Sequence, residues 1–330
     1  MSLSKSNPNS VIPLEIRKRL AKQGYQLYGK QIAVKKCLWT HNYLKEERFC
    51  YKNAYGIKSH QCIQATPTLL CNHQCIFCWR LLEKDIGLKP FWKVDPSEFD
   101  TPEEIYEGLL WGWKRCLSGY KPIVSTELFE EAMQPKHVAL SLSGEPTIYP
   151  YLIELLSLLR EKGMSTFLVS NGTNPEVFQK MIDTKIYPTQ LYITIPAPDK
   201  KEYFNICKPL ISDGWDRINT SLEIMNAMDC RTVTRLTMAK KINMIRPKDY
   251  VPLIAKASPS FIEIKGFSPV GFSQHRVTRA NMPYIEDIQA FANEILEELP
   301  LYKQVFEMEE SKVVILSNNK QPLKIAEKQI

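Results

Sequence analysis

Three cysteines stand close together in the segment Cys71-Asn-His-Gln-Cys75-Ile-Phe-Cys78, which directly follows an apolar, strand-like stretch. Three thiolates on one short loop can bind a metal ion or an iron–sulfur cluster. A closed structural zinc site usually takes a fourth protein ligand, and His73, inside the loop, is awkwardly placed to complete one tetrahedron. The spacing therefore favours a [4Fe–4S] cluster with one open iron, and zinc is the alternative.

A second, more widely spaced set consists of Cys37, Cys50 and Cys62. These lie in the segment 25–62, which is rich in Tyr and Lys and has no clear apolar periodicity. We predict an irregular lobe that a bound metal or cluster would help to order. The other cysteines fall in predicted helices or at their ends, and we expect them to be small core residues without a role: Cys116, Cys207 and Cys230.

Composition and length set the class of protein. The chain has 330 residues, of which 44% are hydrophobic and 24% charged, so it can bury a large core and is not a disordered protein. No apolar run is long enough to span a bilayer, and the first 30 residues have no apolar signal region. We therefore expect a cytoplasmic protein, where cysteine clusters more often bind metals than form disulfides.

Positive charge is concentrated near the amino terminus. Residues 1–62 hold twelve Lys/Arg and three acidic residues, a balance of +9, while the rest of the chain is slightly acidic. A basic segment of this kind favours a polyanionic partner, and a merely solvated basic helix is the alternative. Pro13 and Gly24 bound a predicted helix over 13–23. Its exposed face carries four cations: Arg17, Lys18, Arg19 and Lys22.

From about residue 62, strand-like and helix-like segments alternate six times. Thr101-Pro-Glu-Glu104 is a capping box for one helix, and Asn281 is the predicted cap of the last. The predicted strands are 62–70, 137–142, 165–169, 190–195, 232–238 and 261–267. The predicted helices are 101–117, 150–162, 175–183, 214–228, 247–257 and 282–298. A strand pair near 303–307 and 312–317 closes the chain.

Six β–α units predict an α/β fold with a parallel sheet curved into a partial (β/α)6 barrel. We expect three parts: a basic, cysteine-bearing lobe over 1–62, the barrel over 63–300, and a carboxy-terminal extension over 301–330. In such folds the chemistry collects at the carboxyl ends of the strands.

Polar residues do fall at the predicted strand ends. Ser143-Gly144-Glu145 follows the second strand and Ser170-Asn171 the third. Weaker candidates lie on the later strands: Thr194, Arg235, Thr237, Glu263 and Lys265. The alternatives are a simple strand-to-helix turn for the first group and satisfied core groups for the others.

These motifs together resemble the radical S-adenosylmethionine (SAM) superfamily. The resemblance implies that Cys71, Cys75 and Cys78 hold a [4Fe–4S] cluster whose open iron is chelated by SAM, and that reduction yields a 5′-deoxyadenosyl radical. It implies that Phe77 lies against the adenine and that Ser143-Gly144-Glu145 corresponds to a Gly-Gly-Glu segment binding the SAM amino group. It places Ser170 and Asn171 near the ribose or methionine portion, with Thr194, Arg235 and Thr237 as further contacts.

The basic helix, the spaced cysteines and the segments Cys50-Tyr51-Lys52 and Pro135-Lys136-His137 resemble the tRNA 4-demethylwyosine synthase family of wybutosine biosynthesis. That family condenses N1-methylguanosine in tRNA(Phe) with pyruvate. The resemblance implies a second [4Fe–4S] cluster on Cys37, Cys50 and Cys62 that holds pyruvate. It also implies a Schiff base between Lys52 and pyruvate, with a phosphate contact as the alternative, and tRNA contacts from the amino-terminal cations and Arg80.

Two departures and two alternatives remain. Pro196 stands where related sequences can have Asp, with Asp199 as a candidate substitute. The flavodoxin-like domain of eukaryotic relatives is not expected here, so we expect an external electron donor. We also expect a monomer. The alternatives are a radical SAM enzyme acting on another RNA or protein substrate and a zinc-ribbon RNA-binding protein. Iron in anaerobically purified protein would exclude the zinc protein.

Overall fold

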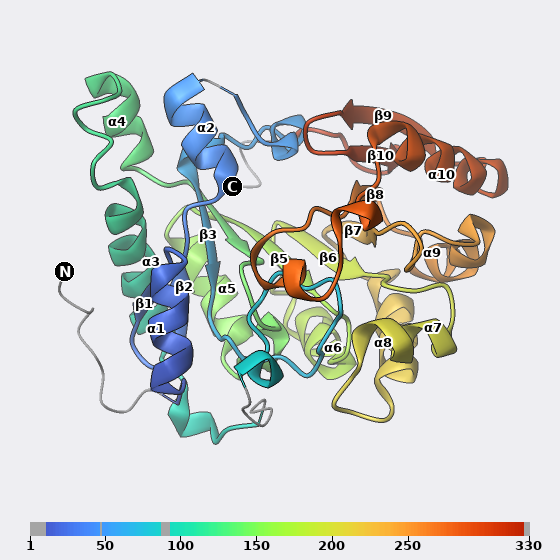
Figure 1. Cartoon of the computed structure of the whole chain (residues 1–330), viewed down its shortest axis with the longest axis horizontal. Coiled ribbons are helices and arrows are strands. Elements are labelled where there is room, and N and C mark those ends of the chain that lie inside the picture. The colour runs from blue at the N-terminus through green and yellow to red at the C-terminus, as the bar shows by residue number, and fades with distance from the viewer. Residues whose placement is uncertain (1–10, 47, 87–92, 327–330) are drawn as a thin grey trace. The chain divides into compact units, whose positions relative to one another are not determined.

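The computed structural model describes residues 11–46, 48–86 and 93–326 (Figure 1). The chain forms two compact units. The first comprises residues 1–71, 83–169 and 324–330, and the second comprises residues 72–82 and 170–323. Part of the predicted first domain, residues 1–10, lies outside the described residues.

The first unit contains one half of the strands. Its parallel strands are β3 (Cys62–Thr66), β4 (His137–Leu140) and β5 (Ser165–Ser170), and Cys62, His137 and Ser165 lie in register. Strand β2 (Ile32–Val34) runs antiparallel to β3, and β1 (Gln26–Tyr28) runs antiparallel to β2. Because side chains alternate along a strand, Cys62, His137 and Phe167 share one face, which we call the inner face of β3–β5.

Helices of the first unit begin where the sequence provides caps. Helix α3 (Pro102–Leu117) starts at Thr101, whose hydroxyl accepts from the Glu104 amide in the predicted capping box. It packs on β1 and β2, where Gly108 and Gly112 leave room for Tyr28 and Val34 (Figure 1). The other helices are α1 (Leu14–Lys22), α2 (Leu38–Glu46), α4 (Thr126–Ala132) and α5 (Leu152–Glu161). Short 3-10 turns are η1 (Tyr51–Tyr55), η2 (Ser59–Gln61), η3 (Glu83–Ile86), η4 (Pro96–Glu98) and η5 (Pro146–Ile148).

The second unit contains the other strands. Strands β6 (Gln190–Thr194), β7 (Arg231–Met238) and β8 (Phe261–Gly266) are parallel. The predicted closing pair is β9 (Lys303–Met308) and β10 (Val313–Ser317), with β10 antiparallel to both β8 and β9. The helices are α6 (Pro175–Thr184), α7 (Lys200–Cys207), α8 (Gly214–Met225), α9 (Val251–Ala257) and α10 (Ile285–Glu298). Its 3-10 turns are η6 (Pro247–Tyr250), η7 (Gly271–His275) and η8 (Arg279–Asn281).

The α/β class, the six alternating strands and the closing pair are confirmed, with several local corrections. The first strand ends at Thr66, since Pro67 has no amide hydrogen to donate. The segment 25–62 is not irregular throughout, because it forms the β1–β2 hairpin and α2. Helices α4 and α7 were not predicted. Among the described residues, none of the helices has the length and apolarity needed to traverse a bilayer.

Two further predictions at element ends were wrong. Helix α10 is capped by Tyr284, while the Asn281 side chain accepts from Thr278 and closes the turn η8. Cys230 lies in the turn before β7 and not at a helix end. At η8 the Asn281 side chain satisfies the backbone of a tight turn, which competes with helix extension.

Candidate active site

The loop 72–82, which carries Cys75 and Cys78, is fixed by backbone hydrogen bonds within the second unit. The amides of Gln74 and Ile76 donate to the carbonyl oxygens of Cys207 and Ile206, both at 2.9 Å, at the end of α7. The guanidinium of Arg276 donates to the carbonyl oxygens of Ile76 and Arg80 at 3.2 and 3.1 Å, and also to that of Cys78. These hydrogen bonds fix the path of the loop backbone.

Two predicted side chains on this loop have clear surroundings. Phe77 is half-buried and packs against the apolar group Ala239, Phe267 and Val277, which follows β7 and β8. Arg80 is buried, with 5% of its surface exposed, and donates to the carbonyl oxygen of His73 at 3.0 Å. Arg80 thus stabilises the loop, and its contact with tRNA stays a prediction.

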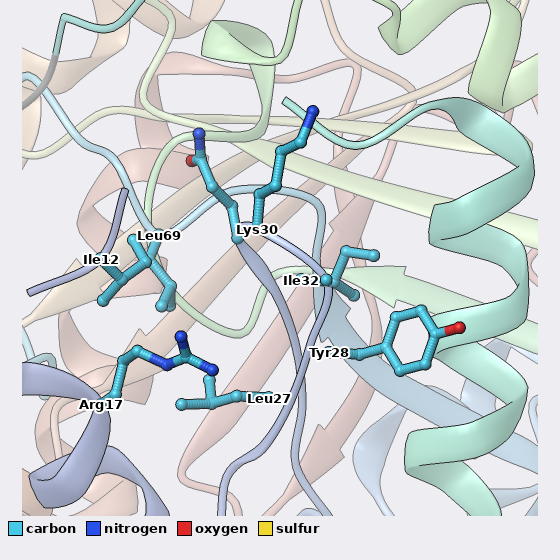
Figure 2. A pocket seen from close by; sticks show the side chains of 9 residues that line it. Ile12, Arg17, Leu27, Tyr28, Lys30, Ile32 and Leu69 are labelled. Atoms are coloured by element: carbon cyan, nitrogen blue, oxygen red, sulfur yellow. The ribbon is translucent and has the colours of Figure 1, made fainter. Parts of the chain in front are cut away.

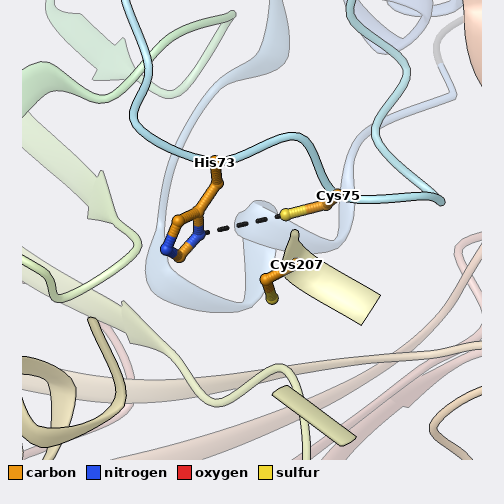
Figure 3. A group of neighbouring side chains, drawn as sticks. All are labelled: His73, Cys75 and Cys207. Carbon is orange, nitrogen blue, oxygen red and sulfur yellow. Dashed lines mark hydrogen bonds between the residues drawn. The ribbon is translucent and has the colours of Figure 1, made fainter. Parts of the chain in front are cut away.

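Cys75 has unexpected neighbours. His73 Nδ1 lies 4.0 Å from its sulfur (Figure 3). On the other side of the ring, His73 Nε2 lies 2.7 Å from the hydroxyl of buried Tyr203. A hydrogen bond to Cys207 and then burial raise the pKa of the Cys75 thiol well above its usual range. Cys207 was expected to be a core residue and is fully buried, and its contact with Cys75 was not predicted because α7 was not predicted.

The segment Ser143-Gly144-Glu145 forms a tight turn in the first unit. Gly144 has a φ of +77°, and a side chain there would place its Cβ 2.3 Å from the carbonyl oxygen of Thr68. The Glu145 amide donates to the carbonyl oxygen of Leu70 at 2.7 Å, which ties this turn to the residue before Cys71. Only glycine permits this approach.

The polar side chains of that turn differ in whether they have hydrogen-bond partners. Glu145 Oε1 accepts from the amide and hydroxyl of Thr147 at 3.1 and 2.7 Å. Ser143 Oγ is buried and has no hydrogen-bond partner within the described part of the chain. A buried hydroxyl without a partner is costly, and a polar ligand atom at this turn would satisfy it.

The end of β5 contacts the cysteine loop. Asn171 donates from its side-chain amide to Asn72 Oδ1 at 2.9 Å, and Asn72 donates to the Thr173 hydroxyl at 2.8 Å. Ser170 Oγ accepts from the Gly172 amide at 3.0 Å. Asn171 is thus part of a network that positions the loop, while Ser170 stabilises the turn after β5.

The later candidates share one face of β6–β8. Thr194, Arg235 and Glu263 lie in register, and Arg235 forms a buried ion pair with Glu263. Two residues further along each strand, on the same face, Thr237 lies beside Lys265, whose ammonium group donates to a backbone carbonyl oxygen at 2.7 Å. A buried charged pair of this kind fixes side chains in a defined orientation.

The region around Pro196 is structural. Its carbonyl oxygen accepts from the side-chain amide of Asn243 at 3.0 Å. Asp199 caps α7 by accepting from the Glu202 amide at 2.9 Å, and it also pairs with Arg246. The Glu202 hydrogen bond, followed by the Arg246 pair, holds the pKa of Asp199 below its usual value despite partial burial.

The second cysteine set gathers in the first unit. Burial raises the pKa of Cys62 to about 12, the nearby Lys52 ammonium opposes this, and Cys37 and Cys50 add to it. The Lys52 amine and the Cys37 and Cys50 thiols thus each act electrostatically on the Cys62 thiol. The Lys52 nitrogen lies 4.6 Å from the ring centroid of Phe167, on the inner face of β3–β5. The second cluster on Cys37, Cys50 and Cys62 and the role of Lys52 stay predictions.

The cysteine-bearing lobe is held in place by contacts that the sequence did not predict. Thr40 donates from its hydroxyl to the carbonyl oxygen of Ser59 at 3.1 Å, which joins α2 to η2. His60 is fully buried, stacks on Tyr43 at 4.4 Å, and pairs with Glu131 of α4 at 2.9 Å. These long-range contacts, which have no local sequence pattern, position the loops on either side of Cys50.

The cations of α1 face solvent except for Arg17. Lys18, Arg19 and Lys22 are exposed, and Arg19 pairs with Glu15 at 3.0 Å. Arg17 is half-buried and points toward Leu27 in a small hollow formed by α1, the β1–β2 hairpin and Leu69 (Figure 2). The predicted basic surface is therefore present on the first unit.

Two family models match the sequence. The radical SAM superfamily model covers residues 66–251, more than half of the chain, and accords with the predicted partial barrel. A model described as wyosine base formation covers residues 256–318. The S-adenosyl-L-methionine-dependent tRNA 4-demethylwyosine synthase of Pyrococcus abyssi is 44% identical over 315 residues, which are 94% of this chain and 90% of that protein.

Solved structures are similar over nearly the whole chain. The structure of TYW1 with a lysine-pyruvate adduct bound has a TM-score of 0.82 and 37% identity, and the match covers 96% of this chain and 99% of that chain. The crystal structure of archaeal TYW1 has a TM-score of 0.75 and 35% identity, with 95% and 100% covered.

Proposed function

We propose that this chain, which belongs to the radical SAM family of tRNA 4-demethylwyosine synthases, forms 4-demethylwyosine from N1-methylguanosine in tRNA(Phe) and pyruvate. The reaction is the tricyclic step of wybutosine biosynthesis. The alternative of a radical SAM enzyme with another RNA or protein substrate is not favoured, because the wyosine base formation model also matches.

The observation that carries the substrate assignment is the position of Lys52. Its amine lies 4.6 Å from the centroid of the Phe167 ring, on the inner face of β3–β5, and its charge acts on the Cys62 thiol. A relative of this chain has been solved with a lysine-pyruvate adduct. We assign Lys52 as the residue that forms a Schiff base with pyruvate, because an amine held at a partly buried site can attack a ketone.

Two [4Fe–4S] clusters are proposed. The first is held by Cys71, Cys75 and Cys78 and the second by Cys37, Cys50 and Cys62, since each set offers three thiolates. With SAM bound, the first cluster supplies the radical chemistry. The protein's part is to hold SAM: Phe77 lines its adenine, the Ser143 hydroxyl and the Gly144-Glu145 turn receive its amino end, and Ser170, Asn171, Thr194, Arg235 and Thr237 are further contacts.

The iminium of Lys52 with pyruvate explains how the protein activates the second substrate. Forming it releases water, and its positive nitrogen accepts electron density when the carboxylate leaves. The Phe167 ring stabilises a cation at this position, because the face of an aromatic ring carries partial negative charge. Lys52 is therefore the catalytic residue of the proposal.

The tRNA is the polyanionic partner. Arg17, Lys18, Arg19 and Lys22 of α1 contact its phosphates in this proposal, and Arg80 supports the loop close to the modified base. The lobe 1–62 then carries the second cluster, 63–300 the radical chemistry, and 301–330 the closing strands. An external donor supplies electrons to a monomeric, cytoplasmic enzyme.

The test is anaerobic incubation of cluster-reconstituted protein with SAM, a reductant, pyruvate and N1-methylguanosine-containing tRNA(Phe), followed by nucleoside mass analysis. The expected product is 4-demethylwyosine, with label from the keto and methyl carbons of pyruvate and none from its carboxylate. SAM cleavage without any modified nucleoside, at full cluster content, would overturn the substrate assignment. Omission of pyruvate is the matched control.

A further inference from the structure

We propose that His73, Cys75 and Cys207 form a separate metal site that binds a thiophilic divalent cation such as Zn²⁺ in the cluster-free protein. The two sulfurs and one imidazole nitrogen of these residues lie within 4.8 Å of one another (Figure 3). Cys75 cannot serve this site and the proposed radical SAM cluster together. Zinc at this site therefore competes with cluster assembly.

The ligand set and its spacing suit zinc. Zn²⁺ binds Cys sulfur at about 2.3 Å and His nitrogen at about 2.0 Å in a tetrahedron, so ligand atoms lie roughly 3.5–3.8 Å apart. The observed separations are slightly larger, and small side-chain rotations bring the atoms to bonding distance. His73 and Cys207 are buried, with 3% and 0% of their surface exposed, while Cys75 is half-buried and gives access.

The imidazole of His73 is already oriented for this role. Its Nε2 lies 2.7 Å from the hydroxyl oxygen of Tyr203, which is itself fully buried. When Nε2–H donates to that oxygen, the lone pair of Nδ1 faces Cys75, whose sulfur is 4.0 Å away. A second hydrogen bond that fixes the free nitrogen of a ligating histidine is typical of protein metal sites.

The backbone holds the two cysteines together independently of any cluster. The amides on either side of Cys75, those of Gln74 and Ile76, donate to the carbonyl oxygens of Cys207 and Ile206. The end of α7 and the loop are thus joined by two hydrogen bonds that bracket the sulfurs. The ligand set therefore includes neither Cys71 nor Cys78.

Three protein ligands leave the fourth zinc position to water. Such open sites release zinc more readily than closed four-ligand sites. Zinc would therefore delay cluster assembly without preventing it. The binding itself does not depend on the proposed function, whereas its competition with iron does.

The first experiment measures zinc binding by anaerobic, reduced, cluster-free protein against a chromophoric chelator. A background with Cys37, Cys50 and Cys62 changed to Ala removes the other thiol set. We expect about one zinc per chain, and at least about tenfold weaker binding for Cys207→Ser. Cys230→Ser, a half-buried cysteine of the same unit, is the matched control and should bind as tightly as the parent.

Tyr203→Phe tests whether His73 is a zinc ligand or whether the neighbouring cysteine sulfurs alone bind the ion. Loss of the hydrogen bond to His73 should weaken zinc binding by roughly 10–100-fold, with every cysteine retained. The opposite pattern overturns the proposal: Cys71→Ser and Cys78→Ser weaken binding while Cys207→Ser does not. That result would place zinc on the three loop cysteines. Repeating the Cys207→Ser and Cys230→Ser comparison in the otherwise unmodified chain keeps the test valid if the background folds poorly.

The second experiment follows iron uptake during reconstitution, with and without one prior equivalent of zinc. Zinc should slow assembly of the cluster on the loop, and Cys207→Ser should abolish the delay while Cys230→Ser keeps it. An equal delay in both variants would contradict the competition. Iron content and visible absorption report the result without any activity measurement.

Discussion

The ammonium nitrogen of Lys52, on the turn η1, lies 4.6 Å from the ring centroid of Phe167, on strand β5. The strand register places Phe167 on the same face as Cys62, the first residue of β3. Lys52, two positions after Cys50, therefore contacts the inner face of β3–β5. This relationship makes Lys52 the centre of the pyruvate chemistry that we propose.

Lys52→Arg should abolish product formation. Arginine keeps the positive charge above Phe167 but is not deprotonated in proteins, so it cannot form an imine. Both clusters and tRNA affinity should be retained. Borohydride added with labelled pyruvate under anoxic conditions should label the Lys52 peptide of the unmodified chain and no peptide of the variant. Near-normal product from Lys52→Arg would make Lys52 a phosphate contact.

Phe167→Leu should weaken the same step without removing the amine. The loss of a cation–π contact of about 0.5–2 kcal/mol should lower the rate of borohydride trapping by roughly 2–30-fold. Phe178→Leu is a matched control, because Phe178 is a fully buried aromatic residue on α6 in the second unit. The two variants lose similar packing, so equal trapping rates would argue against a role for the ring.

The cysteine sets predict an iron count. We expect about eight irons per chain after reconstitution, in two [4Fe–4S] clusters. Changing Cys37, Cys50 and Cys62 to Ala should leave about four irons, permit SAM cleavage and eliminate product. Iron analysis, deoxyadenosine release and nucleoside mass analysis measure the three outcomes. A maximum of about four irons in the unmodified chain would disprove the second cluster.

Local signals explain why the strands and the cysteine loop could be predicted. Alternating apolar residues and the capping box at Thr101 depend only on neighbouring positions, and the predicted starts of β4 and β5 agree with the structure. These features need no knowledge of distant residues. Gly144 is different, because the close approach of the Thr68 carbonyl oxygen also requires glycine there.

Tertiary contacts explain what could not be predicted. Cys207 and Cys75 are far apart in sequence and meet only because α7 ends beside the loop. The stacking of His60 on Tyr43 and its pairing with Glu131 likewise join distant segments. Arg276 contacts three loop carbonyl oxygens from a turn without regular periodicity. No local residue pattern predicts these long-range contacts.

Glu131→Gln should loosen the cysteine lobe. Glu131 pairs with both Lys58 and the fully buried His60, and Lys58 chiefly accounts for its lowered pKa. Because Glu131 is itself partly exposed, we expect a loss of about 1–2 kcal/mol in the free energy of unfolding of cluster-free protein. Glu130→Gln, on an exposed position of the same helix, is the control and should be nearly neutral. Urea unfolding monitored by circular dichroism measures both.

Asp199→Ala should cost about 1 kcal/mol by removing the cap of α7, while Asp199→Asn should lose much less because the amide oxygen still accepts from Glu202. The lowered pKa of Asp199 means that its carboxylate stabilises the fold above the ordinary value of 3.8, and that this stability is lost as the pH falls through the folded value. The difference between Asp199→Ala and the unmodified chain should therefore be constant from pH 5 to 8 and shrink below about pH 4. Urea unfolding of cluster-free protein across this range gives the answer.

Charge reversal on α1 should weaken tRNA binding and reduce its salt dependence. Changing Arg17, Lys18 and Arg19 to Glu removes up to three phosphate contacts, and each contact contributes about 0.9 to the slope of log affinity against log salt concentration. The slope should fall by about 2–3, whereas SAM cleavage without tRNA should be unchanged, because α1 lies outside the residues proposed to hold SAM. The matched control has the same net charge. In it, three exposed lysines of the second unit are changed to Glu: Lys185, Lys201 and Lys303. If both triple variants lose affinity equally, only net charge matters. If neither changes the slope, α1 is a solvated basic helix and tRNA binds elsewhere on the protein.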